Sequence, residues 1–272
     1  SIGTVDYTKG LSVWFDTPNN LDGQAIWLRA SGSGANPDKT WESRSLPIGN
    51  GSLGANILGS VAAERITLEK TLWKGGPNTS KGAEYYWDVN KQSAGVLKEI
   101  RQAFLDEDKE KAAQLTRNNF NGLAAYEEKD ETPFRFGSFT TMGELYVETG
   151  LNELRMSNYR RILSLDSAMV VVQFDKDGVQ YQRKYFISYP DSVMVMKFTA
   201  NQSGKQNLIL SYCPNSEAKS NLRADGKDGL VYTGVLDNNG MKFAFRIKAI
   251  HKGGTLEAEN DRLIVKGADE VV

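Results

Sequence analysis

The sequence predicts a mainly β protein, built as one large antiparallel β-sandwich with a short helical insertion near residues 93–118. Three observations support this fold class. From residue 143 onward, short runs of β-branched and aromatic residues alternate with turn residues at strand-like intervals. The 272 residues are 40% hydrophobic and 25% charged, which is typical of a globular domain with a core. Helical periodicity is confined to one segment of the chain.

The strands are clearest in the second half of the chain. Residues 144–148 alternate with period two, which places Leu145 and Val147 on one face of a strand. Residues 175–178 (DKDG) form a hairpin signal, because Gly178 can adopt the positive φ of a tight turn. Sequential antiparallel pairing, as a meander or a Greek key, is the expected result. The expected strands are 144–148, 170–174, 179–185, 193–198, 208–212, 242–250 and 262–265.

The helical insertion is expected to contain two short amphipathic helices. Val96, Ile100, Ala103 and Phe104 recur at spacings of three and four, the period of a helix with one apolar face. The acidic run at 106–108 then supplies first-turn residues for a second helix, where negative charge is favoured.

The length fits one large domain or two ordinary ones, since all-β sandwiches often extend to about 200–250 residues, and does not decide between them. We expect a single domain over residues 1–272. Residues 263–265 predict a strand, and another apolar run begins at Val271. We therefore expect the chain to be the N-terminal part of a longer protein. Residues 1–9 lack the basic and apolar regions of a signal peptide.

Charge and composition argue against several classes of function. The formal net charge is −1, from 33 basic and 34 acidic residues spread along the chain, so nucleic acid is not an expected partner. No apolar run approaches the roughly 20 residues that cross a bilayer, so no membrane partner is expected. The single Cys213 and single His251 cannot form a disulfide or a cysteine- or histidine-rich metal site. We expect neither a metal nor a cofactor.

The most distinctive motifs lie in the first third of the chain. Residues 46–55 (LPIGNGSLGA) are followed by 64–68 (ERITL) and 71–77 (TLWKGGP). Residues 143–145 (GEL) and 183–191 (RKYFISYPD) continue the series. Together these segments resemble the opening signature of glycoside hydrolase family 95, the α-L-fucosidase group: G-N-G-x-L-G-A, then E-R-I-x-L, then L-W-x-G-G-P. The resemblance covers nearly the whole chain, in order.

Two departures from that signature occur. Glu69-Lys70 stands where an acidic pair is expected before the Thr-Leu-Trp, and the segment at 23–40 is longer than the expected link.

The resemblance implies an N-terminal β-sandwich of the supersandwich type, followed in the whole enzyme by a helical linker, an (α/α)6 barrel and a C-terminal β-domain. The catalytic residues of the inverting reaction would belong to the barrel, which would begin after Val272. No catalytic residue is therefore assigned to this sequence, and the chain alone is expected to be inactive. The expected partner is the intramolecular helical barrel, the substrates would be α-L-fucosyl or α-L-galactosyl glycans, and the location would be periplasmic or extracellular.

Four residues are candidates for carbohydrate binding or for docking of the barrel: Asn50, Trp73, Asn78 and Trp87. A tryptophan face offers apolar area to sugar C–H groups, and an asparagine next to it offers hydrogen bonds. Core or interface use of tryptophan is nevertheless more common. The Asn50-Gly51 pair is also a hairpin signal. The acidic clusters at 106–108 and 127–131 are typical of a solvated surface, so no catalytic carboxylate pair is assigned.

Three functions remain open at this point. The first is a non-catalytic domain that braces the barrel of an α-L-fucosidase-like enzyme. The second is an autonomous carbohydrate-binding module that recognises a fucosylated glycan. The third is a structural or adhesion sandwich without a role in glycan recognition. Related barrel enzymes such as disaccharide phosphorylases also carry an N-terminal sandwich, and sandwich folds host all of these functions.

Overall fold

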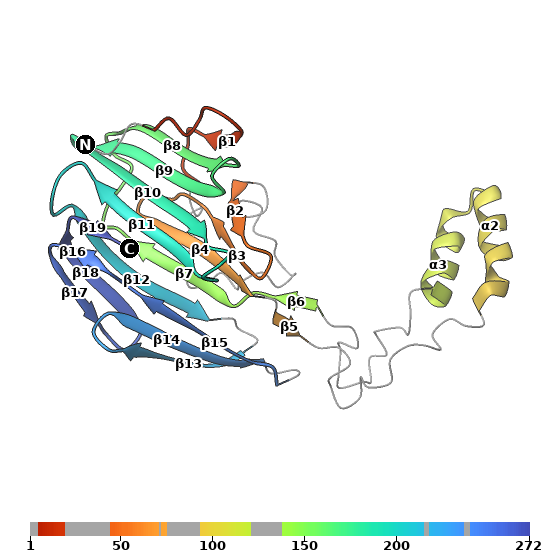
Figure 1. Ribbon diagram of the computed structural model, residues 1–272. Coiled ribbons are helices and arrows are strands. Elements are labelled where there is room, and N and C mark those ends of the chain that lie inside the picture. Colours follow the sequence, from red (N-terminus) through yellow and green to blue (C-terminus); the bar gives the residue numbers. More distant parts are fainter. Residues whose placement is uncertain are drawn as a thin grey trace. The chain divides into compact units, whose positions relative to one another are not determined.

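The computed structural model describes residues 5–19, 44–70, 72–74, 93–120, 138–214, 218–236 and 240–272 (Figure 1). The chain divides into two compact units. The larger unit comprises Ser1–Leu72 and Phe139–Val272, and the smaller unit comprises Trp73–Ser138. The strands are antiparallel, and the prediction of a mainly β protein with a short helical part is confirmed.

The larger unit contains two seven-stranded sheets. The first sheet has the strand order β1 (Ser12–Phe15), β8 (Met156–Ser164), β9 (Met169–Lys176), β10 (Val179–Ile187), β11 (Met194–Ala200), β19 (Glu270–Val271) and β16 (His251–Lys252). The second sheet has the order β17 (Thr255–Ala258), β18 (Arg262–Ala268), β12 (Gln206–Pro214), β7 (Gly143–Glu148), β4 (Ala63–Lys70), β3 (Leu53–Ile57) and β2 (Leu46–Gly49).

A three-stranded sheet of β13 (Ala218–Asp225), β14 (Gly229–Leu236) and β15 (Lys242–Lys248) completes the larger unit. Its aromatic side chains pack against β12: the ring of Tyr212 lies 4.5 Å from that of Tyr232 and 4.8 Å from that of Phe245, between centroids. β5 (Leu72–Lys74) and β6 (Ser138–Thr140) form a separate two-stranded sheet, and the smaller unit lies between them in the sequence.

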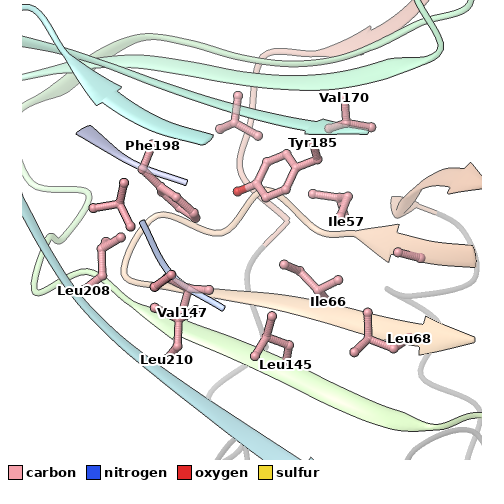
Figure 2. Close-up of a cluster of buried hydrophobic side chains, with 14 of the residues drawn as sticks. Ile57, Ile66, Leu68, Leu145, Val147, Val170, Tyr185, Phe198, Leu208 and Leu210 are labelled. Carbon is pink, nitrogen blue, oxygen red and sulfur yellow. The ribbon is translucent and has the colours of Figure 1, made fainter. Parts of the chain in front are cut away.

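The core lies between the two large sheets. Figure 2 shows Val170, Tyr185 and Phe198 of the first sheet directed toward Ile66, Val147 and other apolar residues of the second sheet. Leu145 and Val147 share this inward face, as their alternation predicts. Glu144 and Tyr146, on the opposite face of β7, are buried as well, so this strand is covered on both sides.

The predicted hairpin at residues 175–178 is confirmed by the register of β9 and β10, in which Val179 pairs with Lys176. Asp177 and Gly178 have φ values of 51° and 78°. Positive φ at both central residues is the type I′ arrangement, whose twist matches that of the flanking strands. An aspartate followed by glycine is therefore well suited to this turn.

The smaller unit contains the predicted helices, as the 3-10 turn η2 (Ser93–Val96), α2 (Leu97–Leu105) and α3 (Lys109–Phe120). Ile100 and Ala103 are buried, whereas Phe104 is 61% exposed. The prediction was wrong in including Phe104 in the buried face. Asp108 accepts a hydrogen bond from the N–H of Lys111 at 3.0 Å, so the acidic run caps α3 at its start. Among the described residues, no helix is long and apolar enough to cross a membrane.

Candidate functional site

Of the four candidate residues, only Asn50 has a described side chain. Trp73 lies in β5, but its side chain is outside the described part of the structure. Asn78 and Trp87 lie outside the described residues altogether. The candidate site is therefore built from Asn50 and from what surrounds it.

Asn50 joins the two large sheets at one end of the sandwich. Its Oδ1 accepts hydrogen bonds from the N–H groups of Ser52 at 3.0 Å and Leu53 at 2.8 Å, which fixes the β2–β3 turn. Its Nδ2 donates to the carbonyl of Ser188, just after β10, at 3.0 Å. These contacts use most of the hydrogen-bonding capacity of an amide side chain. Asn50 thus holds the two layers together and has little capacity left for a sugar.

Three turns meet at this end, and we call them together the turn face: residues 50–52, 165–168 and 188–193. Strand register places them side by side, because Ser164 and Phe186 both pair with Met169. The Asn50–Ser188 hydrogen bond adds the turn of the second sheet. The ends of β-sandwiches are where connecting loops gather and where binding residues are often found.

The turn face and its edge expose large apolar side chains. Tyr189 is 78% exposed, Leu165 57% and Val193 46%. Leu11 is 67% exposed and lies beside the β8–β9 turn, because its carbonyl accepts the N–H of Leu165 at 2.8 Å. Several exposed apolar residues gathered on one face indicate a surface that contacts another protein part.

The β10–β11 turn is held in one shape by its own polar groups. The hydroxyl of Ser188 donates to Asp191 Oδ2 at 2.6 Å, and the N–H of Ser188 donates to the carbonyl of Val193 at 2.9 Å. Ser192 has φ of 52°, a left-handed conformation that few serines adopt. The exposed ring of Tyr189 is therefore presented from a fixed turn.

A buried ionic cluster lies in the interior of the sandwich. Glu64 of β4 is fully buried, and its Oε2 lies 3.6 Å from Arg183 Nη1 and accepts the hydroxyl of Tyr185 at 3.0 Å. Its Oε1 accepts the N–H of Gly59 at 2.8 Å. The pKa of Glu64 is raised, because the effect of burial is larger than the lowering effects of Arg183 and of the hydrogen bonds from Gly59, Tyr185 and Arg65.

Arg183 also holds the connection between β3 and β4. It donates to the carbonyl of Ser60 at 2.6 Å and to that of Val61 at 2.8 Å. The Glu64–Arg183 pair thus fixes a buried loop between the sheets, and the role of both residues is structural. Sequence reasoning assigned Glu64 only to the E-R-I-T-L motif, because charged residues are usually solvated.

Arg161 is a second fully buried cation, and it holds two segments that are distant in the sequence. Its Nε donates to the carbonyl of Thr17 at 3.1 Å, and its Nη1 donates to the carbonyl of Arg44. Its guanidinium carbon lies 3.9 Å from the ring centroid of Phe15. Burial lowers the pKa of Arg161. Arg161 of β8 therefore holds the segment after β1 of the first sheet and the segment before β2 of the second sheet.

The outer face of the second sheet carries a further buried group. Arg65 Nε donates to Glu144 Oε1 at 2.9 Å, and the hydroxyl of Tyr146 donates to Glu144 Oε2. Burial, followed by the nearby charge of Glu144, raises the pKa of Tyr146. The same two causes raise the pKa of the Cys213 thiol, which makes a reactive thiolate unfavourable.

No metal site is present in the described part of the chain, where no three His, Cys, Asp or Glu side chains gather as ligands. Nδ1 of His251 lies 2.8 Å from the carbonyl of Gly253 in its own turn. The histidine therefore has a local structural contact.

Comparison with known proteins adds the family context. Residues 33–272 match the family model described as "Glycosyl hydrolase family 65, N-terminal domain". The chain is 28% identical over 226 residues to "Probable alpha-fucosidase A" of Aspergillus niger, covering 79% of this chain and 24% of that protein. It is 27% identical over 195 residues to "Alpha-L-fucosidase 2" of Arabidopsis thaliana, covering 71% of this chain and 21% of that protein.

A solved structure of a protein assigned as a kojibiose phosphorylase, from the human microbiome, aligns over 49% of this chain and 22% of its own. The identity is 8% and the TM-score 0.33, which is too low to support a comparison of sites. The chain spans about a quarter or less of the length of the two curated relatives.

Proposed function

We propose, on the premise that the chain belongs to the glycosyl hydrolase family 65 N-terminal domain family, that it is a non-catalytic domain bracing the catalytic part of a larger enzyme. In this proposal the parent enzyme is of the family 95 type and cleaves α-L-fucosyl or α-L-galactosyl glycans. Its catalytic part is a helical (α/α)6 barrel, and the enzyme works outside the cytoplasm. Support comes from the names of the two relatives and from their much greater length.

The observation that carries the proposal is the turn face. A sandwich that worked alone would gain nothing from exposing Tyr189, Leu165 and Val193 together, since exposed apolar area favours association. A second domain of the same chain would cover this area without the translational entropy cost of a separate partner.

The residue inventory of the larger unit agrees with a bracing role. Its fully buried carboxylate, Glu64, is held by Arg183, Tyr185 and a backbone N–H, and the nearly buried Glu144 is held by Arg65 and Tyr146. The two side chains lie on opposite faces of the second sheet, because Glu64 points to the core and Glu144 to the outer face. They cannot flank one glycosidic bond, as an inverting pair about 6.5–9.5 Å apart must.

The first experiment compares this chain with the full-length protein in an assay for release of L-fucose from α-1,2-fucosyl glycans. We expect turnover by the full-length protein and none by residues 1–272. Turnover by the short chain at a rate similar to that of the full-length protein would contradict the proposal.

The second experiment tests the docking surface in the full-length protein. Tyr189→Asp places a charge in the covered face and should lower both the melting temperature and the activity. Leu154→Asp is the matched control, because Leu154 is an equally exposed apolar residue (72%) at the other end of β8. If the two variants behave alike, the turn face is not the docking surface.

A further inference from the structure

A polar groove opens at the end of the first sheet that lies opposite the turn face. It is formed by the β9–β10 turn, the start of β8 and the residue that follows β11, and its volume is about 580 Å³. Volumes of about 300–1,000 Å³ are typical of sites for small molecules. Every residue that lines it is within the described part of the larger unit.

The backbone around the groove adopts conformations that need a reason. Arg155 and Asn158 have φ values of 56° and 53°. Asparagine tolerates the left-handed region, but arginine seldom occupies it. The pairing of β8 with β9 also shifts register between Ser157 and Arg160, which bends the strand. Such strained positions gather at binding sites, where they direct side chains toward a ligand.

Next to the groove, on the core-facing side of β9, lies a buried ammonium group. Lys176 is only 7% exposed, and its Nζ donates to Asn152 Oδ1 at 3.0 Å and to the carbonyl of Leu154 at 2.6 Å. Asp177 Oδ2 lies 3.6 Å from the same Nζ. These three oxygen neighbours fix the Lys176 side chain, which ties the β9–β10 turn to the segment that precedes β8.

The walls hold polar groups that are fixed on one side and have capacity left on the other. Arg155 pairs with Asp177 at 3.1 Å, and Asp175 Oδ2 accepts Asn158 Nδ2 at 2.6 Å. Asn201 Oδ1 accepts the N–H of Gln180 at 2.9 Å and its Nδ2 donates to Gln180 Oε1 at 3.5 Å, which leaves the second N–H of this amide as a donor at the rim. A guanidinium, a carboxylate and an amide each have more hydrogen-bonding positions than these contacts occupy.

The charge of the groove selects the class of ligand. Arg155 is paired with Asp177, so an anion finds no uncompensated positive charge, and among the described residues no three acidic side chains gather to hold a divalent cation. Preoriented donors and acceptors of this kind suit a neutral molecule with several hydroxyl groups. We propose that this groove is a binding site for a neutral saccharide, held through its hydroxyl groups.

This inference goes beyond the proposed bracing function and is independent of it, because the groove and the turn face lie at opposite ends of the same strands. The chain would then both dock against the barrel and hold a glycan at a distance from it.

The test is isothermal titration calorimetry of the 272-residue chain with L-fucose, lactose and fucosyllactose, and in separate runs with inorganic phosphate and calcium chloride. The variants are Arg155→Gly and Asn201→Ala, and the control is Ser192→Gly. The two glycine variants are matched, since each replaces a left-handed residue with one that adopts the same backbone without strain. Both should therefore stay folded, and only the first removes a wall of the groove.

We expect at least one neutral saccharide to bind, with affinity about tenfold weaker in Arg155→Gly and in Asn201→Ala and unchanged in Ser192→Gly. Three results would overturn the proposal: no heat from any neutral saccharide up to about 50 mM, where a ligand of millimolar Kd saturates; saccharide binding that neither groove variant weakens; or binding of phosphate or calcium alone. Tyr189→Asp should leave the titration unchanged, so failure of the docking proposal is recognised separately.

Discussion

At one end of the sandwich the turns expose Leu165, Tyr189 and Val193, whereas at the other end the same sheet presents Arg155, Asp175 and Asp177 around a groove. The same strands run between the two ends, so the chemical difference comes from the turns and the strand ends. Apolar turns fixed by Asn50 suit a large protein surface, and paired charges suit a small polar ligand. One β-sandwich thus supports two surfaces of different chemistry without any change in its core.

The largest expected effect concerns the core that both ends share. Glu64→Ala leaves Arg183 charged and without its carboxylate in the interior, which should reduce the free energy of unfolding by about 3–5 kcal/mol. Urea denaturation followed by tryptophan fluorescence measures the change. Glu64→Gln, which keeps the shape and a hydrogen-bond acceptor, should lose less. A loss below about 1 kcal/mol in the alanine variant would show that the cluster does not support the two ends.

The next effect is confined to the turn face. Asn50→Ala removes the hydrogen bonds to Ser52, Leu53 and Ser188 and should reduce the free energy of unfolding by about 1–3 kcal/mol. Ser52→Ala is the control, since Ser52 contributes only an exposed contact with Lys70. If saccharide binding at the groove changed with Asn50→Ala, the two ends would be coupled and the comparison between them would fail.

A smaller effect is expected in the pH dependence of stability. The pKa of Glu64 is raised above its ordinary value of 4.5 by burial, so the folded state binds the proton more tightly than the unfolded state. The stability from this group is therefore present below pH 4.5 and is lost as the pH rises through the folded pKa. Denaturation curves recorded between about pH 4 and 8 should show that the Glu64 contribution to the free energy of unfolding falls as the pH rises in the wild type and is missing in Glu64→Gln. An identical pH profile in both proteins would contradict it.

The smallest effect compares left-handed residues at the two ends. Ala168→Gly in the turn face and Arg155→Gly at the groove both remove a side chain from a position with φ near 50°. Each should raise the free energy of unfolding by less than about 1 kcal/mol, since relief of backbone strain is offset by the entropy of glycine in the unfolded chain. Thermal melts measure both. A loss of stability in Arg155→Gly alone would mean that the Arg155–Asp177 pair stabilises the fold more than surface pairs usually do.

The sequence predicted the elements whose pattern is local. Period-two alternation identified β7, and a run of β-branched and aromatic residues identified β9. The aspartate–glycine pair identified the β9–β10 turn, and spacings of three and four identified α2. β13 and β14 were not predicted, because polar and apolar side chains alternate less regularly in residues 218–236 than in β7. Phe104 was misplaced for a related reason, because a period gives a face of the helix but not what covers it.

The sequence by itself determined the class of fold, the family resemblance and the helical insertion, since each follows from neighbouring residues or from an ordered set of motifs. Only the tertiary structure showed that Asn50 joins the two sheets through its hydrogen bonds, and that Glu64, Arg161 and Arg183 are buried. It alone brought Arg155, Asp177 and Asn201 around one groove. The physical reason is that burial of a charge and the shape of a site depend on which strands pair, and strand pairing joins residues far apart in the chain.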